Sequence, residues 1–327
     1  MPGRCNDADR KPEDGWQDDT AALRDGIRRF LGFSPCHEPP RLQTIETVAE
    51  RGYRRLLIHY DSPDGDEIPA YLFIPDANGP FPAVLAHHQH NGERFLGKSE
   101  VCGLAGDPLQ AFAPALATRG VVVLAPDSIC FEDRRRQRGG RVADSGADWL
   151  QHYNEMAYRL LSGDLLMRKV LNDSALAVTV LESCVFVNRA RIGMLGHSYG
   201  GNTVLFHAAL DERIGFACSS GAASSYAVKM ASDTGIEQAE VIPGFAQHWD
   251  IHDLVACIAP RPLLLVSATD DPYSCDAPEV KARARWSYSA MSADAALQHL
   301  RFAGGHALTP ERFDRIVEWV ISQCLIE

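Results

Sequence analysis

Continuous apolar runs alternate with amphipathic stretches along most of the chain. The runs lack polar alternation, as strands buried on both faces do, while the stretches between them carry apolar residues at helical spacing. This rhythm predicts an α/β fold with a mostly parallel central sheet and helices on both faces. The predicted core strands span residues 83–87, 121–125, 192–195, 214–219, 262–267 and 298–302.

The amphipathic stretches predict helices, and one pair of β-rich runs predicts a hairpin. Residues 54–60 and 68–74 flank the turn-forming sequence Ser-Pro-Asp-Gly-Asp at 62–66. We expect a polar tail and a helix over residues 1–44 and one α/β domain over 45–327. The predicted helices span 18–33, 109–119, 153–187 with a break near 162–163, 199–210, 277–291 and 310–324, and residues 224–250 show no clear periodicity.

A G-x-S-x-G sequence lies between a predicted strand and a predicted helix. It reads G-H-S-Y-G at 196–200. Such a sequence is common by chance, but in this setting it is typical of a sharp turn that exposes the serine hydroxyl. Its two glycines stand where a side chain would clash within the turn. Ser198 is therefore the candidate nucleophile.

A serine hydroxyl needs a base to take its proton, and one of the twelve histidines is well placed for this. His306 follows the last predicted strand in the sequence Gly-Gly-His. In a parallel sheet, the loops after the carboxyl ends of the strands meet at one edge, where Ser198 is also expected. We predict that His306 is the base; the alternative is an ordinary histidine of a surface loop.

The base in turn needs a carboxylate that fixes its tautomer. Asp270 and Asp271 both follow the strand predicted at 262–267. We favour Asp271, because the proline after it lets it begin a turn whose side chain points back at the site. Asp270 would then be a solvated carboxylate or a helix cap.

An oxyanion hole requires two backbone N–H donors. We predict one at Tyr199, directly after the nucleophile, and the second at Gln89, with His88 and His90 as alternatives. The histidines at 87–90 could instead suggest a metal site. No matching set of ligands stands beside them in the sequence, so we expect neither a metal nor a cofactor.

Charge and composition exclude several partners. The chain has 327 residues and a net charge of −11, which disfavours nucleic acid and an anionic membrane surface. No apolar stretch reaches the length of a membrane span, and the polar N-terminus lacks a secretory signal. The nine cysteines are scattered without a C-x-x-C pair, as expected for reduced thiols in the cytoplasm. The oligomeric state is not indicated.

With these residues in place, the sequence resembles the α/β-hydrolase superfamily, most of all its branch of dienelactone hydrolases and acetyl xylan esterases. The resemblance covers residues 45–324 and includes the chain order Ser, Asp, His. It implies an α/β-hydrolase catalytic domain over 45–327, with Ser198 as nucleophile, Asp271 as acid and His306 as base. The motifs are P-A-V-L-A-H-H-Q at 82–89, G-K at 97–98, V-L-A-P-D at 123–127, R-I-G-M-L-G-H-S-Y-G-G at 191–201, A-P-R-P-L-L-L-V-S at 259–267 and G-G-H at 304–306.

Two departures from the family pattern bear on chemistry. His88-Gln89 stands where His-Gly is more usual, and the nucleophile is serine where dienelactone hydrolases often have cysteine. We therefore predict a serine hydrolase that cleaves a small-molecule carboxylic ester through an acyl-enzyme. A peptidase, or a hydrolase of lactones or amides, would use the same residues. A non-catalytic binding protein is the more distant alternative, and the lack of G-x-G-x-x-G after an early strand disfavours an oxidoreductase.

Three further features have two readings each. The five arginines at 134–141 form either a solvated loop with local ion pairs or a lid that meets an anionic group of the substrate. Trp249 and His252 either line the substrate pocket or pack in the core. Asp127, at the end of a predicted strand, either orders the rim of the site or has no role there.

Overall fold

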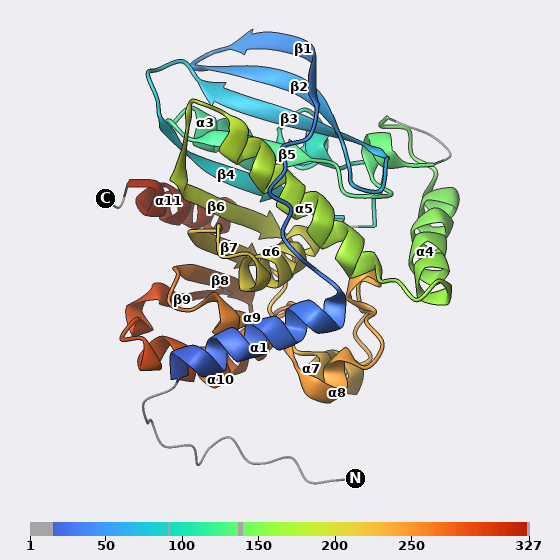
Figure 1. The fold of residues 1–327 in the computed structure, drawn as a ribbon, viewed down its shortest axis with the longest axis vertical. Coiled ribbons are helices and arrows are strands. Elements are labelled where there is room, and N and C mark those ends of the chain that lie inside the picture. The colour runs from blue at the N-terminus through green and yellow to red at the C-terminus, as the bar shows by residue number, and fades with distance from the viewer. Residues whose placement is uncertain (1–15, 91, 137–139, 326–327) are drawn as a thin grey trace.

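The computed structural model describes residues 16–90, 92–136 and 140–325, and these residues form a nine-stranded sheet covered by helices (Figure 1). The strands lie in the order β1-β2-β3-β5-β4-β6-β7-β8-β9. The pairs β1/β2, β2/β3 and β3/β5 are antiparallel, and the other five pairs of neighbouring strands are parallel. The strands are β1 Leu42–Glu50, β2 Tyr53–Asp61, β3 Glu67–Pro75, β4 Phe81–His87, β5 Val122–Pro126, β6 Val187–His197, β7 Phe216–Ser220, β8 Leu263–Ala268 and β9 Leu297–Phe302.

Helices cover both faces of this sheet, as predicted. The covering on one side includes α1, α5, α6, α9 and α10, and α3 and α11 lie on the other. The helices are α1 Trp16–Leu31, α2 Lys98–Val101, α3 Phe112–Ala117, α4 Ser145–Leu161, α5 Leu166–Ser183, α6 Tyr199–Leu210, α7 Tyr226–Ala231, α8 Phe245–His248, α9 Ile251–Ile258, α10 Ala277–Ala290 and α11 Pro310–Leu325. The fold is the α/β-hydrolase fold that the sequence predicts.

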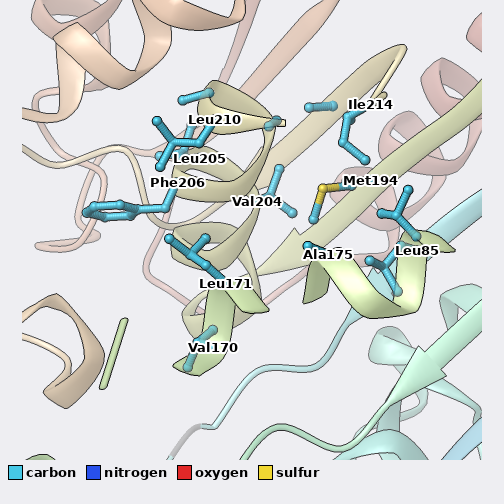
Figure 2. Packing of buried hydrophobic residues seen from close by; sticks show 14 of the residues in the cluster. Leu85, Val170, Leu171, Ala175, Met194, Val204, Leu205, Phe206, Leu210 and Ile214 are labelled. Atoms are coloured by element: carbon cyan, nitrogen blue, oxygen red, sulfur yellow. The ribbon is translucent and has the colours of Figure 1, made fainter. Parts of the chain in front are cut away.

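Each core strand supplies apolar side chains to both faces, which explains why the runs show no alternation. In β8, Leu263 and Leu265 pack into one core while Leu264 and Val266 pack into the other. Figure 2 shows the larger core where α5 and α6 meet the sheet, with Met194 of β6 among their apolar side chains. Burial of both faces fixes these strands at the centre of the molecule.

Several predicted elements differ from the structure in extent, and some observed elements were not predicted. The hairpin appears as β2 and β3, and the break in the long helix separates α4 from α5. The helix predicted at 109–119 is wrong in extent, because a 3₁₀ turn, Pro108–Gln110, precedes the short α3. Residues 224–250, predicted to be irregular, contain α7 and α8. The strand β1 and the helix α9 were not predicted.

No helix within the described residues is both long enough and apolar enough to cross a membrane. The proposed boundary between residues 44 and 45 stays a prediction. The helix on the N-terminal side of this boundary, α1, packs against α6, α9 and α10.

Candidate active site

Ser198 occupies a strained turn between β6 and α6. Its backbone has φ 56° and ψ −121°, a conformation that a non-glycine residue rarely adopts. The Ser198 N–H donates to the Ser220 carbonyl at 2.8 Å, and the Ser198 carbonyl accepts from the Asn202 N–H at 3.0 Å. These bonds hold the turn to the end of β7 and to the first turn of α6.

Both flanking glycines are required by close backbone contacts. A Cβ on Gly196 would lie 2.3 Å from the carbonyl atoms of Gly200, and a Cβ on Gly200 would lie 2.4 Å from the His87 carbonyl oxygen. No side chain fits at either distance. The second contact also places the end of β4 directly against the turn that carries Ser198.

The structure brings Ser198, His306 and Asp271 together from three separate loops. His306 Nε2 lies 2.8 Å from Ser198 Oγ, and His306 Nδ1 lies 3.0 Å from Asp271 Oδ1. The carboxylate can only accept when ionised, so Nδ1 carries the proton and Nε2 is free to accept from the serine hydroxyl. His306 is partly exposed, whereas Asp271 is fully buried.

Asp271 is held as an ionised acceptor. Its carboxylate accepts from the Tyr273 N–H at 3.0 Å and from Ser274 Oγ at 2.5 Å. Burial alone would raise the pKa of Asp271, but the hydrogen bond and charge of His306 outweigh it, and the pKa falls below its ordinary value. The side chain of the neighbouring Asp270 is exposed, and it is Asp271 whose carboxylate accepts from His306.

A second histidine, His197, packs against the ring of His306. Its ring centroid is 4.9 Å from that of His306, and its Nδ1 is 2.9 Å from Ser220 Oγ. Burial and the charge of His306 hold the pKa of His197 well below its ordinary value, so the ring stays neutral. Sequence reasoning missed this residue, although it stands inside the G-x-S-x-G sequence.

His88 ties the loop after β4 to the loop after β5. Its Nδ1–H donates to the Gln89 carbonyl at 2.7 Å, and its Nε2 accepts from the Ser128 N–H at 3.1 Å. Burial lowers the pKa of His88 to about 4, which keeps Nε2 free to accept. These bonds fix the peptide next to the predicted oxyanion donor. The role of the Gln89 N–H itself, like that of Tyr199, stays a prediction.

The side chain of Tyr199 is enclosed by rings. Phe131 stacks on it with centroids 5.2 Å apart, and His88, His90 and His152 lie within 6.5 Å of it. The Tyr199 hydroxyl lies 2.6 Å from Ser128 Oγ. The residue after the nucleophile is therefore fixed on both its backbone and its side chain.

A buried carboxylate, Glu237, borders this ring cluster. His90 Nδ1 accepts from the Gly92 N–H at 2.8 Å, so its proton is on Nε2, which donates to Glu237 at 2.7 Å. Burial would raise the pKa of Glu237, but His90, His152 and Arg94 outweigh it and lower the pKa to about 2. Glu237 comes from the segment that showed no periodicity, so the sequence offered no signal for it.

The interpretation of residues 134–141 as a solvated loop is wrong for Arg134 and Arg135. Both are buried, and Arg134 pairs with Asp66 and Asp173 while Arg135 pairs with Asp148. Each guanidinium thus has a carboxylate partner within the fold. Arg136 is half-exposed and bonded to Glu155, and Arg138 lies outside the described residues. Spacing in sequence could not reveal the partners of Arg134, because Asp66 and Asp173 come from distant parts of the chain.

Asp127 belongs to a charge cluster that is buried except for Asp133. Among the described residues, Asp127, Glu132 and Asp133 are grouped closely enough to hold a metal ion. The Lys98 ammonium already lies between them, 2.7, 2.9 and 2.5 Å from their respective oxygens. Burial would lower the pKa of Lys98, but the carboxylates outweigh it and raise the pKa. The residues therefore fit an ammonium group, and they fasten the loop after β5.

Trp249 packs between α1 and α8. Its ring lies 5.2 Å from that of Phe30 of α1 and 5.6 Å from that of Phe245 of α8. His252 is buried on α9, with its Nε2 3.5 Å from Asp253. The contacts of Trp249 attach α1 to the segment that precedes α9.

Comparison with known proteins identifies the family. A sequence profile described as acetyl xylan esterase (AXE1) matches residues 40–220, which include Ser198 and the end of β4. The chain belongs to the acetyl xylan esterase family. It is accordingly a carboxylic ester hydrolase, as the sequence predicted. The matched residues end before Asp271 and His306.

Individual relatives agree with this assignment. The chain is 31% identical over 258 residues to YtaP of Bacillus subtilis (strain 168), named as a hydrolase, covering 77% of this chain and 81% of that protein. A Bacteroides fragilis protein of known structure, named as an acetyl xylan esterase, has a TM-score of 0.72 at 16% identity, covering 90% of this chain and 77% of that one. A glucuronoyl esterase from Solibacter usitatus has a TM-score of 0.67 at 16% identity, covering 96% and 94%. At these identities the solved structures show a common fold.

Proposed function

We propose that this family member cleaves its ester through an acyl-enzyme on Ser198. The observation that carries the proposal is the continuous pair of hydrogen bonds from Ser198 through His306 to Asp271. Ser198 Oγ attacks the ester carbonyl carbon while His306 Nε2 takes its proton, and the proton then passes to the departing alcohol. Water attacks the acyl-enzyme by the same steps in reverse.

The reaction also needs a group that orients His306 and donors that stabilise the oxyanion. Asp271 holds the tautomer of His306 and stabilises the imidazolium that forms. The N–H groups of Tyr199 and Gln89 are the proposed donors to the oxyanion, each worth about 3 kcal/mol in the transition state. Support comes from the His87 carbonyl that packs against Gly200, and from His88, which fixes the peptide after Gln89.

The proposed substrate is an ester of a carbohydrate. The family profile and the solved structures named for acetyl xylan and glucuronoyl esters support this class. An acetylated sugar should accordingly be cleaved faster than a simple alkyl acetate of equal leaving-group reactivity. Comparing kcat/KM for the two substrates tests the choice, and equal values would contradict it.

The proposed nucleophile is tested by Ser198→Ala on p-nitrophenyl acetate. We expect kcat to fall by about 10⁴-fold or more, since removal of the nucleophile disables the whole triad. A fluorophosphonate should label wild type at this residue and leave the variant unlabelled. Ser232→Ala, at an exposed serine after α7, is the matched control and should keep full activity. Wild-type turnover in Ser198→Ala would refute the proposal.

Two alternatives share these residues and need a separate measurement. A peptidase or a lactone hydrolase would show a higher kcat/KM on matched amides or lactones than on esters. A non-catalytic protein on this fold would fail to react with the fluorophosphonate although folded. The strained backbone of Ser198 and its hydrogen bond to His306 disfavour a non-catalytic protein, because a binding protein has no need for that conformation.

A further inference from the structure

The loop that carries His306 is largely exposed, and Gly304 bonds to the loop after β8: its carbonyl accepts from the Asp270 N–H at 2.9 Å and its N–H donates to Thr269 Oγ1 at 3.1 Å. The loop of His306 runs between β9 and α11, and Ala303, Gly305 and Ala307 are all exposed. Gly304 has φ +104° and would have no neighbour within 4 Å of an added Cβ. A short exposed loop with two successive glycines has many accessible conformations, of which the site needs one.

A buried arginine fills the inner side of this loop. Arg312, in the first turn of α11, is fully buried, with 0% of its surface exposed. Its Nη1 donates to the Gly305 carbonyl at 2.8 Å and to the Ala307 carbonyl at 2.6 Å. These carbonyls belong to the residues immediately before and immediately after His306. One rigid guanidinium therefore holds the backbone before and after the proposed base.

The surroundings of Arg312 are those of a positioning group rather than of an ordinary packing residue. Its Nε and Nη2 have no hydrogen-bond partner among the described residues, and the carboxylate that favours its charge is Asp271. Its Cζ lies 5.9 Å above the Phe302 ring at the end of β9. A buried cation with few partners costs stability, and an apolar side chain of similar size would avoid that cost. A requirement of the loop for the two hydrogen bonds to Gly305 and Ala307 would explain why the chain keeps an arginine here despite this loss of stability.

We propose that Arg312 positions His306 for proton transfer from Ser198 by holding the carbonyls of the residues on both sides of it, Gly305 and Ala307. This inference rests on the proposed function, because it assigns His306 the role of base. Arg312 touches neither Ser198 nor the substrate in this account. It acts through the loop alone, so its loss should affect the chemical step more than substrate binding.

The test is Arg312→Met, which keeps much of the apolar bulk and removes both hydrogen bonds. On p-nitrophenyl acetate, kcat should fall by about 10- to 100-fold while KM changes by less than about threefold, because a base misplaced by about 1 Å impairs catalysis and not binding. The rate of fluorophosphonate labelling at Ser198, per folded molecule, should fall in parallel. Guanidinium added to Arg312→Ala should restore part of the lost kcat.

Arg315→Met is the matched control, since Arg315 lies one turn further along α11 and is exposed. It should keep the wild-type kcat. If Arg312→Met does not fold, Arg312→Lys carries the test, because its ammonium ends roughly one bond short of Nη1 and should give a lower kcat with an unchanged fold. Wild-type kcat and labelling in either folded variant overturns the inference, and so does a loss confined to KM.

Failure of this inference can be told apart from failure of the proposed function. If only the inference fails, Ser198→Ala and His306→Ala are inactive while Arg312→Met is fully active. If the proposed function fails, Ser198→Ala and His306→Ala keep wild-type turnover, whatever the effect of Arg312→Met.

Discussion

Two adjacent aspartates, Asp270 and Asp271, follow β8, and their side chains lie in different surroundings. Asp271 is buried and accepts from His306, Tyr273 and Ser274, whereas the Asp270 side chain is exposed. The backbone N–H of Asp270 donates to the Gly304 carbonyl at 2.9 Å, which ties this loop to the loop of His306. Asp270 thus contributes through its backbone and Asp271 through its carboxylate.

This difference predicts unequal effects of the same substitution. Asp271→Asn should lower kcat by about 10⁴-fold, because an amide that presents N–H to His306 favours the wrong tautomer of the ring. Asp270→Asn, the matched control, should stay within about twofold of wild type, since a surface substitution rarely matters. The measurement is kcat on p-nitrophenyl acetate for both variants. Equal losses, or a larger loss in Asp270→Asn, would show that the wrong carboxylate has been assigned.

Residues with a chemical motif could be predicted from the sequence, and residues with only a spatial role could not. Ser198 and His306 stand in recognisable positions after strands, and the structure brings them within hydrogen-bond distance. His197, Glu237 and Arg312 show their importance only through neighbours from distant parts of the chain. Arg312 looks in sequence like any charged residue of an amphipathic helix, because its buried position depends on how the preceding loop folds back.

At the scale of elements, α6 has Ser198 at its N-terminal end and three arginine side chains from other elements at its C-terminal end. Its first turn begins after Ser198, and three arginines from α1 and the loop before β8 donate to carbonyls at its last turn. Positive charge at this end complements the helix dipole, and the bonds satisfy carbonyls that the helix leaves free. The bonds join Arg24 Nε to Ala209 at 3.2 Å, Arg28 Nε to Leu210 at 2.8 Å and Arg261 Nη2 to Ala208 at 2.6 Å.

Arg24 should therefore be far more important for stability than its neighbours on α1. It is buried, and it also donates to the Cys257 carbonyl at 2.9 Å, at the end of α9. Arg24→Met should lower the free energy of unfolding by about 3 kcal/mol, because the Ala209 carbonyl loses this donor and the Cys257 carbonyl keeps only the longer bond from Arg261 Nη2, at 3.4 Å. Arg29→Met, at an exposed position of the same helix, should change it by less than about 0.5 kcal/mol. Urea unfolding of both variants measures the difference, and equal midpoints would contradict this account of α1.

The elements that were not predicted lack the local signals on which prediction depends. β1 forms the edge of the sheet, and most of its residues are exposed on both faces, so its sequence shows no buried stripe. The helix α9 begins with a capping box from Asp250 to Asp253, but its apolar run is short enough to suit a strand equally well. The central strands were predictable because burial on both faces leaves an unbroken apolar run.

At the scale of the whole molecule, the strand order follows from connection rules rather than from any one segment. Right-handed crossovers with helices on both faces give a parallel sheet, and its C-terminal edge collects the loops of Ser198, Asp271 and His306. The packing of the loops at 128–136 and 224–250 over this edge could not be predicted. It depends on the buried pairs of Lys98, Arg134 and Glu237, whose partners come from distant elements.

This packing leaves several histidines buried in the neutral form. Burial lowers the pKa of His88 and of His152 to about 4, and it holds the pKa values of His87 and His197 well below their ordinary value. In the unfolded chain each should titrate near 6.5. As the pH falls below about 6.5, the unfolded chain takes up protons that the folded chain does not, so the stability falls. For His88 and His152 the loss is complete below about pH 4 and reaches about 3 kcal/mol each.

We therefore expect the free energy of unfolding to fall steeply between pH 6.5 and pH 4, and His152→Gln to reduce that slope. The His152 ring faces Arg94, whose Nε donates to its Nδ1 at 2.8 Å, and Glu237 at 3.9 Å. A glutamine oxygen can accept from Arg94 but does not titrate. The number of protons taken up on unfolding at pH 5, obtained from urea unfolding at neighbouring pH values, should therefore fall by about one. His37→Gln, at an exposed position, is the control for the loss of a histidine elsewhere on the chain. An unchanged slope in His152→Gln would mean that His152 is protonated in the folded protein, beside the carboxylate of Glu237.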